Sequence, residues 1–155
     1  MNYHEINKCD VTNGLGIRIS LYLSGCKCRC RNCHNPETWD FNGGMPFDES
    51  AQKMLFEAIS KPYIKGLTLS GGNPLDNYES VLELLKTFKN EFGDTKDVWL
   101  YSGYTLEEII DMGMVEILDY IDVLVDGRYV DELRDLTLAF RGSSNQRILY
   151  KGKDF

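Results

Sequence analysis

The chain has 155 residues, of which 43% are hydrophobic and 26% are charged, and its formal net charge at pH 7 is −7. This length predicts a single domain over residues 1–155 that buries enough surface to fold without disulfide bonds. The acidic balance argues against a general nucleic-acid-binding protein, which would carry a basic surface. No apolar run approaches the ~20 residues that span a bilayer. No signal-peptide core is present either, so we expect a cytoplasmic protein with no membrane partner.

Strand-like and helix-like patterns alternate along the chain. Short β-branched and apolar runs, bounded by glycine, proline or aspartate, predict about five strands. Apolar residues that recur every three or four positions predict helices between them, with N-caps at Asp48, Asn77 and Thr105. Strands are expected at residues 17–23, 66–70, 98–101, 121–125 and 147–150, a turn at 41–46, and helices at 49–61, 78–88, 105–111 and 114–120.

This alternation predicts right-handed crossovers and an α/β fold with helices outside a mainly parallel sheet. About five strands are too few for a closed eight-stranded barrel, and a flat doubly wound sheet is the alternative. Glycine-containing breaks follow three of the strands at residues 71–74, 102–104 and 126–128, and a cysteine-rich loop follows the first strand. Because the carboxyl ends of parallel strands gather at one rim, we expect these breaks to share one site.

Four of the five cysteines lie in the run CKCRCRNC, in which three have the spacing Cys26-x3-Cys30-x2-Cys33. An iron–sulfur cluster normally takes four cysteines, so three leave an open coordination position that suits chemistry. Disulfides are disfavoured because the cysteines are clustered and odd in number. A zinc site that uses all four, including Cys28, lacks the usual second separated pair. Cys28 fits the gap between two ligands and is not expected to bind, and Cys9 is expected to be a small core or surface residue.

Four cations lie in or near the cysteine run, in a chain that is acidic overall. They are Arg18, Lys27, Arg29 and Arg31. Two interpretations remain open for them: solvated loop charges, or cations that stabilise thiolates and an anionic ligand.

The loop LSGCKCRCRNCHNPETWD at residues 23–40 resembles the cluster loop of radical S-adenosylmethionine (radical SAM) enzymes, and is most similar to that of glycyl-radical activating enzymes. Similar blocks lie at residues 11–18, 70–75, 101–104, 123–127 and 140–147. The last block, FRGSSNQR, and the short chain resemble the branch that acts on anaerobic ribonucleotide reductases. The resemblance implies a shortened, open partial (β/α) barrel with a mainly parallel, curved sheet.

The resemblance also implies a mechanism. Cys26, Cys30 and Cys33 would hold one [4Fe-4S] cluster per chain, and its open iron would chelate the methionine moiety of SAM. One electron, from a low-potential donor such as a flavodoxin, would cleave SAM to methionine and a 5′-deoxyadenosyl radical. That radical would take a hydrogen from a glycine Cα on the large catalytic subunit of an anaerobic ribonucleotide reductase. The cofactor performs the difficult chemistry, while the protein binds, orients and shields it.

SAM contacts are expected from Asn32, Cys33 and His34 and from Gly71, Gly72 and Asn73. The two glycines lack a Cβ and would let the backbone approach SAM. Two positions depart from the superfamily pattern. Asn32 replaces an aromatic residue, so the backbone of residues 32–34 or the His34 ring would contact adenine. Asn73 replaces an acidic residue, and its carbonyl would accept from the SAM ammonium without charge assistance.

Other positions and functions remain open from the sequence. Arg141, Ser143 and Asn145 suit either a SAM contact or a partner-docking surface, and Trp39 is expected in the core. The alternative functions are a radical SAM enzyme acting on another protein or a small molecule, and a zinc-binding interaction module.

Overall fold

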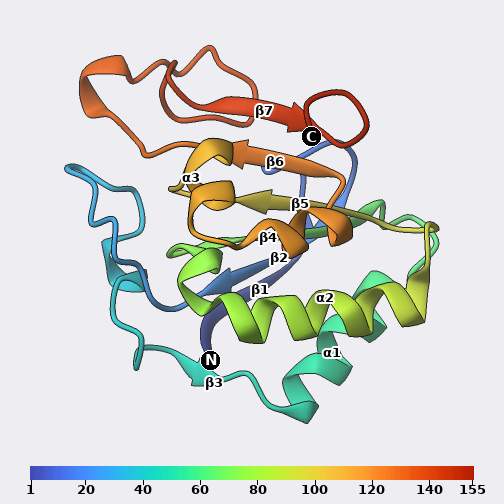
Figure 1. The fold of residues 1–155 in the computed structure, drawn as a ribbon. Coiled ribbons are helices and arrows are strands. Elements are labelled where there is room, and N and C mark those ends of the chain that lie inside the picture. Colours follow the sequence, from blue (N-terminus) through green and yellow to red (C-terminus); the bar gives the residue numbers. More distant parts are fainter.

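The computed structural model describes residues 1–155, and one seven-stranded sheet with the order β3-β1-β2-β4-β5-β6-β7 runs through it (Figure 1). The strands are β1 (Asn2–Asp10), β2 (Arg18–Leu23), β3 (Met45–Pro46), β4 (Gly66–Gly71), β5 (Asp97–Tyr101), β6 (Val123–Asp126) and β7 (Arg147–Tyr150). Strands β2, β4, β5 and β6 are parallel neighbours. Strands β1 and β3 extend one edge, and β7 extends the other, by antiparallel pairing. The sheet is open and mixed.

The prediction of a mainly parallel sheet is therefore wrong at both edges. Strand β1, in the sequence NYHEINKCD, was not predicted because its apolar residues are too few to give an alternating pattern. It pairs antiparallel with β2 and leaves most of its side chains at least partly exposed. The two-residue strand β3 falls in the segment predicted as a turn. The four parallel strands and β7 lie where the sequence predicted them, within two residues at each end.

Three α-helices connect the strands: α1 (Glu49–Ile59), α2 (Tyr78–Phe92) and α3 (Leu106–Asp111). The predicted N-cap of α1 is confirmed, because the Asp48 carboxylate accepts from the Ala51 amide at 2.9 Å. Thr105 and Glu108 form the predicted capping box of α3. Asn77 precedes α2, but its side chain donates to the Ser24 carbonyl instead of capping the helix. Short 3₁₀ helices are η1 (Pro36–Thr38), η2 (Pro74–Asn77), η3 (Val115–Tyr120) and η4 (Asp131–Leu133).

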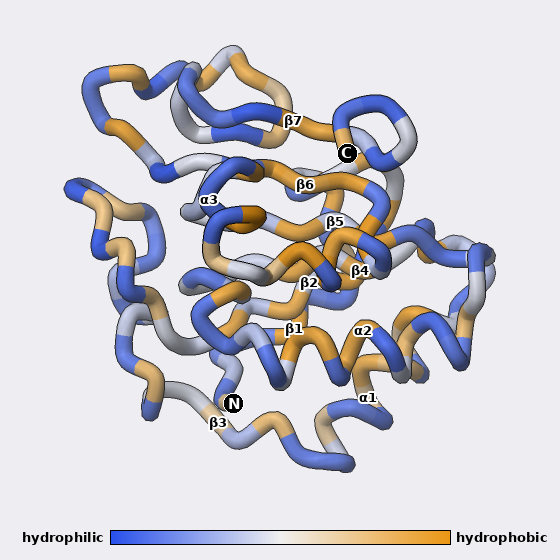
Figure 2. The backbone as a smooth tube through the Cα atoms, in the orientation of Figure 1, coloured by the Kyte–Doolittle hydropathy of each residue, from blue (hydrophilic) through white to orange (hydrophobic).

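The three α-helices and η3 cover one face of the sheet only. Alternate strand residues on this face pack with α1, α2, α3 and η3 in a core of 23 buried apolar side chains. In Figure 2 the central strands are largely hydrophobic, and α2 carries both colours along its length, as expected for a helix with one buried side. None of these helices combines the length and the apolar composition of a membrane span.

The opposite face of the sheet, on which the cavity described below opens, is called the cavity face. Because side chains alternate along a strand, it carries the residues between those of the core: Ser20, Tyr22, Thr68, Ser70, Trp99, Tyr101, Val123 and Val125. Loops cover it in place of α-helices. The Thr68 hydroxyl donates to the Asn13 carbonyl at 2.7 Å, and the Tyr101 hydroxyl donates to the Phe140 carbonyl at 2.8 Å. These contacts place residues 11–17 and 128–146 over the cavity face.

Arg18 belongs to the fold and lies away from the cysteines. It begins β2, whereas the cysteine loop follows the other end of that strand. Its side chain is fully buried, lies 2.6 Å from the Asp97 carboxylate and donates to the Thr68 hydroxyl at 2.8 Å. The interpretation of Arg18 as a cation that stabilises thiolates is therefore wrong.

Candidate metal centre and cofactor pocket

A cavity of about 410 Å³ opens on the cavity face, at the rim where the parallel strands end. This volume is typical of small-molecule sites. In Figure 1 the cysteine loop and the segment after β6 reach out on this same side of the sheet. The lining residues come from the loop before β2, from the cysteine loop, from the ends of β4 and β5 with the turns that follow them, and from residues 127–146. The structure thus brings the four predicted strand-end segments into one site.

Cys26, Cys30 and Cys33 all line this cavity, as expected for ligands of one centre, and none forms a disulfide. The loop is anchored at its base, where the Cys26 amide donates to the Trp39 carbonyl at 3.2 Å. Arg29 and Asn32 both adopt positive φ, at 46° and 56°, so the chain turns sharply twice between the ligands. Cys9, in contrast, is exposed on β1, where the sequence allowed a surface residue.

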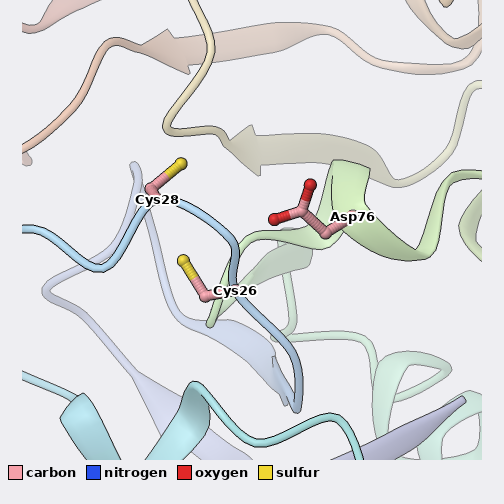
Figure 3. A group of neighbouring side chains, drawn as sticks. All are labelled: Cys26, Cys28 and Asp76. Atoms are coloured by element: carbon pink, nitrogen blue, oxygen red, sulfur yellow. The ribbon is translucent and has the colours of Figure 1, made fainter.

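Cys28 also faces the cavity. Its Sγ, the Sγ of Cys26 and a carboxylate oxygen of Asp76 all lie within 4.8 Å of one another (Figure 3). A Cβ at position 103 would lie 2.6 Å from the Cys28 Sγ, so Gly103 leaves the room that this thiol occupies. A hydrogen bond from the Cys28 thiol favours the Cys26 thiolate, which lowers the pKa of Cys26 to about 6 and raises that of Cys28. Burial raises the pKa of Cys30.

Asn73 and Asp76 form a hydrogen-bonded pair beside these thiols. Asn73 is almost completely buried, its Nδ2 donates to the Asp76 Oδ2 at 3.3 Å, and its Oδ1 accepts from the Gly103 amide at 3.4 Å. The Asp76 carboxylate also accepts from the Lys27 amide at 2.8 Å and from the Tyr104 hydroxyl at 2.5 Å. The sequence points to Asn73, and Tyr104 lies in the strand-end break predicted at residues 102–104, but nothing in the sequence pattern marks Asp76. Its one available signal is its place two residues after the break at 71–74.

Gly71 and Gly72 line the cavity, but their small size serves the backbone. A Cβ at Gly71, where φ is +100°, would meet the backbone of Leu23 in β2. A Cβ at Gly72 would meet the carbonyls of Gly25 and Thr38. The close approach of these backbones therefore explains why neither position carries a side chain, and the expected contact of Gly71 and Gly72 with SAM stays a prediction.

Asn32 and His34 lie differently with respect to the cavity. The Asn32 side chain is exposed and donates to the Asp131 carboxylate at 2.8 Å, outside the cavity. Asn32 is not among the residues that line the cavity, and the contact expected from its backbone stays a prediction. His34 lines the cavity, and its ring lies 4.9 Å from that of Tyr129, measured between centroids.

Trp39 is a cavity wall and not the core residue that the sequence predicted. It is half-buried, and its Nε1 is shielded from solvent without a hydrogen-bond partner. A buried indole N–H normally has an acceptor. This indole N–H is therefore an unpaired donor close to the cavity.

The C-terminal block builds the far wall of the cavity. Ser143 donates to the Asn145 side chain at 2.6 Å, and Asn145 in turn donates to the Arg128 carbonyl at 2.8 Å. These two residues hold the segment in place, and neither lines the cavity. Arg141 and Phe140 do line it, and Phe140 packs on Trp99 with ring centroids 5.2 Å apart.

Comparison with known proteins agrees with a single-cluster iron–sulfur protein. The family model described as a 4Fe-4S single cluster domain matches residues 12–149. The chain is 42% identical over 156 residues to the anaerobic ribonucleoside-triphosphate reductase-activating protein of Pasteurella multocida, covering 97% of this chain and 98% of that protein. It is 39% identical over 152 residues to the Escherichia coli K12 protein of that name, covering 96% and 97%. Identity to the protein of that name from Enterobacteria phage T4 is 42% over 150 residues, covering 96% and 93%.

The chain belongs to the family of anaerobic ribonucleoside-triphosphate reductase-activating proteins. The resemblance drawn from its cysteine loop and C-terminal block is thereby confirmed at the level of the family.

Proposed function

We propose that this chain is a radical SAM activase, in which Cys26, Cys30 and Cys33 hold the [4Fe-4S] cluster. When bound, the cluster and SAM would supply a 5′-deoxyadenosyl radical that takes a hydrogen atom from a glycine Cα of the partner. The partner would be the large catalytic subunit of an anaerobic ribonucleotide reductase, in line with the names of the relatives. The open sheet with one helix-covered face is compatible with a shortened partial barrel of the radical SAM type.

The observation that carries the proposal is the convergence of three cysteines on one cavity at the strand-end rim. Thiolates are the ordinary ligands of iron–sulfur clusters, and three of them leave one iron free for a further ligand. The cavity of about 410 Å³ also has the size of a cofactor site.

The remaining residues of the site would bind and orient SAM. The Oδ1 of Asn73 and the backbone of residues 71–72 would contact its methionine moiety, and the backbone of residues 32–34 with the His34 ring would contact adenine. The large subunit would close the mouth of the cavity and exclude water. A low-potential carrier such as a flavodoxin would deliver the electron, and the single domain would act in the cytoplasm.

Electron paramagnetic resonance tests the proposal directly. Reduced protein with SAM should produce a glycyl-radical doublet when the large subunit is present, and none without it. Cys30→Ala should lose both iron and the doublet, because a cluster ligand is gone. The matched control Cys9→Ala removes an exposed thiol and should retain both.

A large subunit whose acceptor glycine is changed to alanine should give no doublet. Efficient turnover of a free small molecule with no partner would contradict the activase and favour the small-molecule alternative. Full iron content in Cys30→Ala would contradict the ligand set.

A further inference from the structure

Cys28 and Asp76 have no part in the proposed cluster ligation, yet they lie together with Cys26. Two thiol sulfurs and one carboxylate oxygen fall within 4.8 Å of one another (Figure 3). No other three histidine, cysteine, aspartate or glutamate ligand atoms in the chain come this close. Ligand atoms around a tetrahedral zinc ion lie about 3.5–3.8 Å apart, given Zn–S bonds of about 2.3 Å. Shifts of about 1 Å or less would therefore bring the three onto one ion.

The Asp76 carboxylate is held as metal-binding carboxylates commonly are. It accepts hydrogen bonds from the Tyr104 hydroxyl, the Lys27 amide and the Asn73 amide group, which together fix its orientation. Such outer partners are a regular part of metal sites. The chemical donor set of two sulfurs and one oxygen suits zinc and other thiophilic divalent ions, with a fourth position left for water.

We propose that the cluster-free protein binds a single divalent ion of the zinc class through Cys26, Cys28 and Asp76, and that this ion competes with cluster assembly. The competition rests on the proposed function, since it requires Cys26 to be a cluster ligand. The metal site itself does not depend on that function. The proposed site also differs from the four-cysteine zinc site considered from the sequence, because Cys30 and Cys33 do not belong to the group of close ligand atoms formed by Cys26, Cys28 and Asp76.

The site predicts a specific pattern in a metal titration. Cluster-free, full-length protein is titrated anaerobically with Co²⁺, whose thiolate charge-transfer absorption reports the sulfur ligands, and the ion is then displaced with Zn²⁺. The wild type should bind one ion per chain. Cys28→Ala and Asp76→Asn should each weaken binding about tenfold or more, because the first removes a sulfur ligand and the second replaces an anionic carboxylate oxygen with a neutral amide oxygen. Cys30→Ala and Cys33→Ala are the matched controls and should bind as the wild type does.

Two outcomes overturn the site. If Cys30→Ala loses the ion as fully as Cys28→Ala, the metal binds the cluster cysteines instead. If Asp76→Asn binds normally while its melting temperature is unchanged, the carboxylate is no ligand. Equal melting temperatures of the apo variants show that lost binding is not lost folding.

Cluster reconstitution tests the competition separately. One equivalent of Zn²⁺ should slow cluster formation in the wild type, and should slow it much less in Cys28→Ala, where the ion is held weakly. Equal slowing in both proteins would overturn the competition. A protein that passes the Co²⁺ titration but gives no glycyl radical would refute the proposed function and leave the metal site standing.

Discussion

Gly71 and Gly72 bring the end of β4 into direct contact with the start of the cysteine loop. The Gly72 amide donates to the Leu23 carbonyl at 2.9 Å, and the Asn73 amide donates to the Gly25 carbonyl at 2.9 Å. A side chain at either glycine would push these two backbones apart. The same residues therefore fix the position of Cys26 relative to Asn73, so the stability of this contact and the geometry of the site depend on each other.

Two glycine variants separate the cost of an unfavourable φ from the cost of a steric clash between the added Cβ and β2. Gly71 and Gly113 both have positive φ, at +100° and +73°, but a Cβ at Gly113 would meet nothing within 4 Å. Gly113→Ala should cost about 1–2 kcal/mol through the unfavourable φ alone, lowering the melting temperature by about 2–8 °C. Gly71→Ala should cost about 1–3 kcal/mol more, because the added Cβ also overpacks β2. Thermal unfolding of the two variants measures the difference. Equal melting temperatures, with SAM affinity lost only in Gly71→Ala, would assign that glycine to the ligand instead.

Residues of the site differ in how far the sequence could predict them. The cysteines were identified because their spacing is local and chemically specific. Asp76 was not, because its importance comes from contacts with Lys27, Asn73 and Tyr104, and the contacts with Lys27 and Tyr104 join segments that are far apart in the sequence. Trp39 was assigned to the core because a tryptophan near a cavity and one in a core have the same local sequence signature.

On the scale of elements, the buried Asp10 joins the end of β1 to β2 and to the loop that covers the cavity face. Its carboxylate accepts from the Ser20 hydroxyl at 2.5 Å, from the Asn13 amide group at 2.7 Å and from the Thr12 amide at 2.8 Å. Burial alone would raise the pKa of Asp10, but these hydrogen bonds outweigh it and lower the pKa to about 2. Thr12 and Asn13 line the cavity, so this carboxylate also positions part of its wall.

The lowered pKa of Asp10 predicts a pH-dependent contribution to stability. Because the folded-state pKa lies below the ordinary value of 3.8, the contribution is fully present above about pH 4. It is lost as the pH falls from about 4 to about 2, and amounts to at most about 2 kcal/mol. Urea unfolding of the cluster-free chain at several pH values measures it. Asp10→Asn should flatten the slope in this window, whereas Asp94→Asn, at an exposed position, should keep it. A slope unchanged in Asp10→Asn would contradict this role.

The strands and helices could be predicted from the sequence where one side of the strand or helix is buried. Strands β2, β4, β5 and β6 show alternating or continuous apolar residues, and α2 shows a stripe at helical spacing. Strand β1 escaped prediction because it is stabilised by pairing with β2 and not by apolar residues of its own. Edge pairing is a long-range property, and the direction of an edge strand leaves no local signal.

On the scale of the whole molecule, charge is distributed unevenly. The net charge is −7, yet Lys27, Arg29 and Arg31 are all exposed on the cysteine loop. Arg31 lies 3.7 Å from Glu132, and the other two form no ion pair. Opposite charges on two surfaces speed their encounter and make it sensitive to salt. We therefore expect an acidic one-electron carrier, the donor in the proposed function, to dock at this positive loop.

Reversing the positive charges of the cysteine loop tests whether the electron donor docks there. The double variant Lys27→Glu/Arg29→Glu should slow cluster reduction by an acidic carrier about tenfold at low ionic strength and weaken its salt dependence. The control Lys53→Glu/Lys153→Glu makes the same change in net charge at exposed positions outside the loop, and should have a much smaller effect. Stopped-flow absorbance of the cluster measures the rate, and iron content verifies that both variants remain loaded. Equal slowing by the two variants would show that total charge governs the encounter and that the cysteine loop is not the docking point.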